Sequence, residues 1–248
     1  MAFSGAMQTS FLIPAFNEEK FVARAVGSVQ RSAAGCGLAA WEVIVCDNAS
    51  TDRTAAVACE AGATVVQEAH RQIARARNAA AAASSGRRLI WLDADAILTP
   101  EVLASTVQAF DSGRVCGGGA HVVLEGVELD WFSRSAMNSW NWVARNFRLA
   151  AGSYFFAVRE GWEQTGGFDE SVYAGEELGF ALSLKKWGRA RGLEFRVLPH
   201  AVPSSARKIR QYTFFETFRQ VLLCAWPGNR ARRDRCAYWY ERRETSGG

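Results

Sequence analysis

The sequence has no Cys-x-x-Cys spacing among its six cysteines. We therefore expect the cysteines to be reduced thiols in a cytoplasmic protein. No window approaches the roughly 20 apolar residues that are needed to span a bilayer. The N-terminus also lacks a basic segment followed by a long apolar stretch, which argues against a secretory signal peptide. We expect a cytoplasmic protein that would reach any membrane-bound partner from the inner face of the membrane.

Two further absences limit the classes of function. No Gly-x-Gly-x-x-Gly motif follows a predicted strand, which argues against a dinucleotide oxidoreductase. The formal net charge is only +4 and the basic residues are unevenly placed, so the chain does not have the character of a general nucleic-acid binder. Hydrophobic content of 49% and charged content of 22% are those of an ordinary globular protein. A chain of 248 residues can form one substantial core.

Apolar segments of strand length alternate with helical segments through the first half of the chain. We expect strands at 10–14, 41–46, 63–67 and 88–92, and helices at 19–30, from Ser50 onward, at 72–84 and at 100–110. Ser50 suits the N-cap of its helix, and Pro100 suits the first turn of another. These repeated units predict an α/β fold with a parallel, doubly wound sheet.

The second half of the chain is less regular. Gly117, Gly118 and Gly119 lie within a strand-like stretch, which predicts a bulge or close backbone approach rather than a phosphate loop. Residues 129–148 are rich in aromatic side chains and predict a helix. Two further strands are expected at 153–158 and 193–198.

The chain after Ser204 changes to a basic, amphipathic tail. It combines apolar residues such as Phe214, Phe218 and Val221 with at least eight basic residues between 207 and 243. One interpretation is a helical element that lies among the headgroups of an anionic membrane. The alternative is that the apolar side chains pack on the rest of the chain while the arginines are solvated.

Polar clusters follow three of the predicted strands. Asn17 and Glu18 follow the first strand, Asp47 follows the second, and Asp93 and Asp95 follow the strand at 88–92. Because parallel strands bind ligands beyond their carboxyl ends, we expect these groups at one edge of the sheet. Two carboxylates at i and i+2 of an extended segment can face one hard cation or one polyphosphate. A solvated turn after the strand is the alternative for the acidic pair.

Six motifs occur in an order that resembles family 2 glycosyltransferases of the GT-A fold, over roughly residues 10 to 200. The motifs are Ile13–Glu19, Asp47–Thr54, Ala76–Asn78, Asp93–Asp95, Gly166–Glu170 and Gly175–Glu177. The resemblance implies a mostly parallel, Rossmann-like sheet flanked by helices. It also implies a nucleoside diphosphate sugar donor, with a UDP-sugar favoured, a divalent cation, and inverting transfer to a saccharide or a lipid-linked acceptor. We expect residues 1–115 to be the nucleotide-sugar-binding half, 116–205 the acceptor-binding and catalytic half of the same domain, and 206–248 the tail.

The resemblance also assigns residues to the metal and the nucleoside. Asp95 would be the metal ligand, while Asp93 would lie nearer the ribose and reach the metal through water. These hard carboxylates suit Mg²⁺ or Mn²⁺. His200, one of three histidines, follows a predicted strand at the place of a late metal-coordinating histidine in GT-A enzymes, although a lone histidine is more often structural. The residues that would line the nucleoside pocket are Pro14, Ala15, Asn17, Glu18 and Asp47.

Two of these assignments have a structural alternative. Asp47 would read the imide edge of a uracil-like base, or it would form an Asx-turn or helix cap. Arg77 would offset the charge of the diphosphate, or it would lie on a solvated helix face.

An inverting displacement needs a base that takes the proton of the acceptor hydroxyl. Glu176 and Glu177 open a predicted helix, at the position where the family usually has Glu followed by Asp, and the second residue acts as the base. We favour Glu177 over Glu176, although both also suit the first turn of a helix without any chemistry. Since Glu177 replaces the usual Asp, the alternative function is a non-catalytic regulator that binds a sugar nucleotide.

Overall fold

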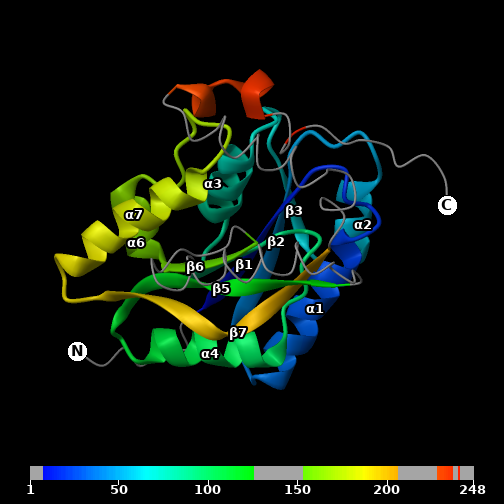
Figure 1. The fold of residues 1–248 in the computed structure, drawn as a ribbon. Coiled ribbons are helices and arrows are strands. Elements are labelled where there is room, and N and C mark those ends of the chain that lie inside the picture. Colours follow the sequence, from blue (N-terminus) through cyan, green and yellow to red (C-terminus); the bar gives the residue numbers. More distant parts are fainter. Residues whose placement is uncertain (1–7, 126–152, 206–227, 237–239, 241–248) are drawn as a thin grey trace, which may run out of the picture.

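The computed structural model describes residues 8–125, 153–205, 228–236 and Tyr240 (Figure 1). The helix predicted at 129–148 and most of the tail lie outside these residues. The first half contains β1 (Thr9–Ala15), α1 (Val22–Gly35), β2 (Trp41–Asp47), α2 (Thr54–Glu60), β3 (Thr64–Gln67), α3 (Ile73–Ala83), β4 (Arg88–Leu92) and α4 (Pro100–Asp111). The second half contains β5 (Val115–Glu125), β6 (Tyr154–Val158), α6 (Arg159–Thr165), α7 (Glu176–Arg189) and β7 (Glu194–Ser205), and two short 3₁₀ helices, η1 (Asn229–Ala231) and η2 (Arg233–Cys236).

Seven strands form one sheet in the order β3-β2-β1-β4-β6-β5-β7. The pairs among β1, β2, β3 and β4 are parallel, as is β5 with β7, whereas β6 runs antiparallel to both β4 and β5. The predicted α/β fold with a mostly parallel sheet is therefore confirmed. The strand expected at 153–158 is present as β6, but its antiparallel direction was not predicted, because a strand's direction depends on its partner and not on its own apolar run.

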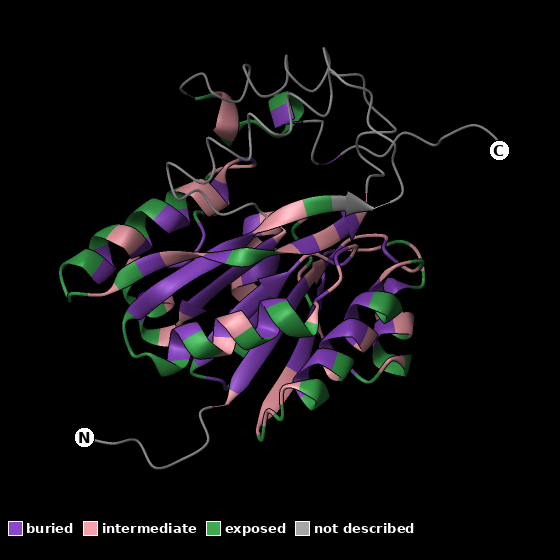
Figure 2. Cartoon of the chain, turned by 60° about the horizontal axis from the view of Figure 1, so that its bottom comes forward, coloured by how far each residue is buried: buried purple, intermediate pink, exposed green. Residues whose placement is uncertain are grey.

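Helices cover both faces of the sheet (Figure 1). The core cluster on one face contains side chains of α1, α2 and α4, and the cluster on the other face contains side chains of α3 and α7. Alternate residues of β1 divide between them, with Phe11 and Ile13 in the first cluster and Leu12 in the second. The central strands are accordingly buried on both sides, as their purple colour in Figure 2 shows, which explains their unbroken apolar runs.

An aromatic cluster holds the second half of the chain against the first. The ring of Trp91 in β4 makes edge contacts with three other rings. These are Phe155 in β6, Phe168 between α6 and α7, and Phe180 in α7, at centroid distances of 6.1, 5.2 and 5.8 Å. All four side chains are buried. The segment between α6 and α7 is thereby fixed over the end of β4.

Glycines in β5, the strand that lies between β6 and β7 in the sheet, allow unusually close backbone approach. A Cβ atom at Gly118 would lie 1.8 Å from the carbonyl oxygen of Arg196, and one at Gly117 would lie 2.4 Å from that of Phe156. The register of β5 against β7 shifts on both sides of this stretch. The prediction of close approach and a bulge at these glycines is confirmed.

Several predicted boundaries differ from the structure. The helix expected from Ser50 begins at Thr54, because the Ser50 hydroxyl accepts a hydrogen bond from the backbone N–H of Asn17 instead of capping α2. The helix expected from 19 begins at Val22, after a turn closed on the Glu18 carbonyl. Pro100 does open α4, behind the capping hydroxyl of Thr99.

The last strand is longer than predicted. β7 continues to Ser205, so His200 lies within the strand rather than after it. β7 is an edge strand of the sheet, where a proline such as Pro199 removes no essential ladder hydrogen bond.

A short part of the tail packs on the domain. Cys236 and Tyr240 are buried against Ala174, with Ile73 and Tyr173 beside them. This contact agrees with the packing interpretation for this part of the tail, and the membrane interpretation stays a prediction. Within the described ranges, no helix combines the length and the apolar character that crossing a membrane requires.

Candidate active site

The carboxyl ends of β1, β2 and β4 meet at one edge of the sheet. In the strand register Pro14 lies opposite Cys46 and Ala15 lies opposite Asp47. Asp93 follows directly on β4, which pairs with the other side of β1. The fold therefore brings together the polar groups that the sequence placed at three separate strand ends.

The loops after β1 and β2 are interlocked by hydrogen bonds. The backbone N–H of Asn17 donates to the Ser50 hydroxyl at 2.9 Å, and the side-chain oxygen of Asn17 accepts from the Thr51 N–H at 2.7 Å. The N–H of Glu18 donates to the Thr54 hydroxyl at 2.7 Å. Asn17 thus shapes the loop, and its contact with a nucleoside stays a prediction, as does that of Glu18.

Asp47 lies buried at the end of β2. Its Oδ1 accepts a hydrogen bond from the Ser50 N–H at 3.3 Å, and Ala49 between them has a positive φ of 61°. The turn that the structural alternative predicted is therefore present. A carboxylate has acceptor sites beyond this one bond, so the turn and base recognition are compatible.

Asp93 and Asp95 form a turn after β4. The N–H of Ala96 donates to the Asp93 carbonyl at 3.0 Å, and the Asp95 carbonyl accepts from Ser205 at the end of β7. The Asp93 side chain is 32% exposed. Nowhere in the described parts of the chain do three or more His, Cys, Asp or Glu side chains gather around one metal position.

The acidic pair nevertheless fits a hard divalent cation. Mg²⁺ and similar ions are often held by one or two carboxylates together with phosphate oxygens of the substrate and water. Asp93 and Asp95 supply such a two-carboxylate donor set at a partly open strand end.

His200 is not brought together with the acidic pair. It is exposed on β7 and lies near Glu101 in the first turn of α4. Asp95 contacts Ser205, which lies five residues after His200 on β7. At roughly 3.3 Å per residue, His200 and Ser205 are about 16 Å apart along the strand. The assignment of His200 to the metal stays a prediction that this arrangement does not favour.

Arg77 links the acidic pair to the two glutamates. Its side chain is only 5% exposed, and its guanidinium contacts Glu176 Oε1 at 2.9 Å, Asp93 Oδ1 at 3.4 Å and Glu177 Oε2 at 3.7 Å. Trp91 Nε1 donates to the Arg77 carbonyl at 3.1 Å. The alternative of a solvated helix face is wrong, because this side of α3 packs on the sheet.

The two glutamates differ in environment. Glu176 is buried, with 4% of its side chain exposed, while 27% of the Glu177 side chain is exposed. Burial raises the pKa of Glu176, the neighbouring Glu177 raises this pKa further, and Arg77 offsets only part of the rise. Burial alone would lower the pKa of Arg77, but Glu176, Glu177 and Asp93 raise it, so the guanidinium is charged.

Glu177 is the more exposed of the two glutamates, but one of its carboxylate oxygens is enclosed. Its Oε2 is a buried atom without a hydrogen-bond partner among the described residues. Such an atom carries a desolvation penalty that a donor from a bound molecule would relieve. Arg77 contacts Glu176 at 2.9 Å and Glu177 at 3.7 Å, so it holds Glu176 more closely, and the choice of Glu177 as the base stays a prediction.

Replacing Arg77 with methionine is expected to lower the free energy of unfolding by about 3–5 kcal/mol, because buried carboxylates lose their cation. The folded state then holds the Glu176 proton still more tightly than the unfolded state does. Because burial and Glu177 already raise the pKa of Glu176 to about 8 with Arg77 in place, Glu176 is protonated in both folded proteins well below that pH, and the loss that arises from Glu176 should grow as the pH rises through about 8 and shrink on acidification. Urea unfolding over a pH series measures it. Arg75→Met is the control, since the partly exposed pair of Arg75 with Glu170 should contribute at most about 1 kcal/mol.

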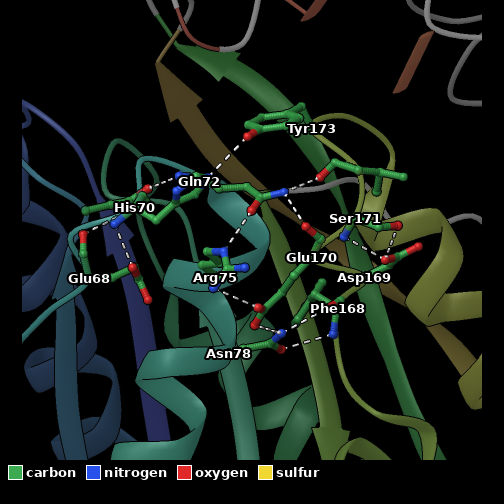
Figure 3. A network of polar contacts seen from close by, with 12 residues as sticks. Glu68, His70, Gln72, Arg75, Asn78, Phe168, Asp169, Glu170, Ser171 and Tyr173 are labelled. Atoms are coloured by element: carbon green, nitrogen blue, oxygen red, sulfur yellow. Dashed lines mark hydrogen bonds and ion pairs between the residues drawn. The ribbon is translucent and has the colours of Figure 1, made fainter. Parts of the chain in front are cut away.

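A network of hydrogen bonds that the sequence did not predict joins the loops of the site (Figure 3). The side chain of Asn78 donates to the Phe168 carbonyl at 2.8 Å and accepts from the Phe168 N–H at 3.0 Å. Gln72 and Asn48 are buried polar residues in the same region. The only signal of this network in the sequence was Gln72, a polar residue immediately before the alanine-rich helix α3.

The fold places the chain among glycosyltransferase structures. It superposes on the mannosyltransferase PcManGT from Pyrobaculum calidifontis, in complex with GDP-Man and Mn²⁺, with a TM-score of 0.64 and 19% identity over 88% of this chain and 61% of that protein. Glucosyl-3-phosphoglycerate synthase from Mycobacterium tuberculosis, in complex with Mn²⁺, UDP and glucosyl-3-phosphoglycerate, superposes with a TM-score of 0.63 and 20% identity over 93% of this chain and 80% of that protein. TarS from S. aureus superposes with a TM-score of 0.61 and 17% identity over 94% of this chain and 70% of that protein. These similarities confirm the GT-A fold, and this chain spans about three fifths of the first of the three proteins.

A family model described as "Glycosyl transferase family 2" matches residues 10–163. The match covers more than half of the chain, and the chain therefore belongs to this family of glycosyltransferases. No curated protein sequence matches the chain. The family and the enzyme class inferred from the six motifs are confirmed.

Proposed function

We propose that the protein is a metal-dependent, inverting glycosyltransferase that moves a sugar from a nucleoside diphosphate sugar to an acceptor hydroxyl. The observation that carries the proposal is the contact of one buried arginine, Arg77, with both the Asp93 carboxylate and the glutamate pair. Similar structures hold GDP-Man or UDP together with Mn²⁺, which supports a sugar nucleotide and a divalent cation here.

The donor would bind across the carboxyl ends of β1, β2 and β4. The backbone of Pro14 and Ala15 and the carboxylate of Asp47 would surround the nucleoside, with a UDP-sugar favoured. Residues 1–115 would thus form the donor half and 116–205 the catalytic half of one domain. Asp95, with Asp93 beside it, would hold Mg²⁺ or Mn²⁺, which supplies positive charge to the diphosphate leaving group.

Glu177 would take the proton of the acceptor hydroxyl. As the acceptor oxygen bonds to the anomeric carbon, the bond from that carbon to the diphosphate breaks and its electron pair leaves with the nucleoside diphosphate. Arg77 holds Glu176 and positions Glu177 beside it. The acceptor would be a saccharide or a lipid-linked molecule, the latter reached if the tail contacts a membrane surface.

A panel of UDP-, GDP- and dTDP-sugars tests the proposal. With Mn²⁺ present, one sugar nucleotide is expected to raise the midpoint of thermal unfolding, since a ligand that binds only the native state stabilises it. The same compound should be hydrolysed slowly, with release of the nucleoside diphosphate. Binding without turnover would instead support a regulator, and a panel without any shift would contradict a sugar-nucleotide site.

A further inference from the structure

Gln72 is a buried polar side chain at the start of α3, and the proposed chemistry does not use it. It is 1% exposed. Its Nε2 donates to the carbonyls of Glu170 at 2.9 Å and Val172 at 2.8 Å, and its Oε1 accepts from Arg75 Nε at 3.1 Å. Both amide hydrogens are therefore bonded to one short segment of backbone, as Figure 3 shows.

The backbone of Gln72 is tied to the loop after β2. Its N–H donates to Asn48 Oδ1 at 2.8 Å, and Asn48 Nδ2 donates to the carbonyls of Glu68 and His70 at 3.1 and 2.7 Å. The N–H of Asn48 donates to the Ala15 carbonyl at 2.8 Å. Asn48 directly follows Asp47, so this chain of bonds begins within the proposed nucleoside pocket.

The segment that Gln72 holds leads directly into the glutamate pair. Val172 lies three residues before Gly175, which has a φ of 76° and precedes the first turn of α7. Asn78 anchors the segment at Phe168, and the Arg230 carbonyl accepts from the Tyr173 N–H at 2.6 Å. Between these anchors, the two bonds from Gln72 fix the path of the backbone toward Glu177.

We propose that Gln72 is a positioning residue that couples the nucleoside pocket to the catalytic base, an inference that rests on the proposed function. It acts through the backbone of 170–175 and sets where the Glu177 carboxylate stands relative to a bound donor. Small displacements are costly in such an arrangement, because a misplacement of about 1 Å far from the reacting atoms can reduce rate by about 100-fold.

Gln72→Met keeps the length of the side chain and removes both hydrogen bonds to the segment. We expect kcat for hydrolysis to fall by about 10- to 100-fold, with the KM for the donor nearly unchanged. The substrate is the UDP-, GDP- or dTDP-sugar that gives the largest thermal shift with Mn²⁺. Gln72→Glu is the second variant, since it retains an acceptor for Arg75 and places a carboxylate oxygen, which cannot donate, against the two carbonyls, and it should show the same loss.

Gln30→Met is the matched control. Gln30 Nε2 in α1 donates to the Ala61 carbonyl at 2.8 Å, so this variant also loses an amide-to-carbonyl bond, but away from the site. It should retain kcat even where its thermal midpoint falls. Equal loss of kcat in the Gln30 and Gln72 variants, or full kcat in both Gln72 variants, would overturn the inference. If the unsubstituted protein does not hydrolyse the donor, the proposed function and the inference are overturned together.

Discussion

Replacing Glu177 with glutamine is expected to reduce turnover by about two to four orders of magnitude, the usual contribution of a positioned general base. Affinity for the donor should be nearly unchanged, since the amide has almost the same shape and the donor contacts lie at the strand ends. Steady-state kinetics on the donor identified by thermal shift measure kcat and KM separately.

Glu176→Gln separates the two members of the glutamate pair. Glu176 is buried against Arg77, so its replacement should lower stability more than the Glu177 change does. If Glu176→Gln instead shows the selective loss of kcat, the roles of the pair are reversed. If neither variant loses kcat, the base lies elsewhere or the protein does not transfer.

Asp95→Asn is expected to abolish metal-dependent donor binding and to leave the fold intact, because a neutral amide is a far poorer ligand for a hard cation. The thermal shift produced by the donor should then no longer depend on Mn²⁺. Asp111→Asn makes the same chemical change on an exposed residue at the end of α4, and it should retain the full shift. Full activity in the Asp95 variant would exclude Asp95 as the metal ligand.

Features that depend on a short stretch of sequence could be predicted from the sequence alone. Buried parallel strands are short apolar runs, and the residues that follow them stand at the edge of the sheet whatever the rest of the chain does. For this reason Asp47 and Asp93 were placed correctly at the ends of β2 and β4, the two strands that flank β1. The close backbone approach at Gly118 was also predictable, since a glycine within a strand pattern indicates such an approach.

Features that depend on distant partners were not predictable. Arg77 is separated by 99 residues from Glu176, and its burial follows from how α3 and α7 pack on the same face of the sheet. Ser50 fits a helix cap by its residue type, yet Asn17 from another loop engages its hydroxyl. His200 was expected after a strand at 193–198, yet it lies within β7, because an edge strand tolerates Pro199.

The antiparallel strand β6 has a practical consequence for dividing the protein. It bonds to β4 on one side and to β5 on the other, although it lies more than 60 residues after β4 along the chain. A fragment that stopped at residue 115 would leave β4 as a bare, apolar sheet edge, with Trp91 and Leu92 deprived of their neighbours Phe155 and Tyr154. Such an edge is a template for pairing with other chains, so the donor half expressed alone would aggregate rather than bind nucleotide.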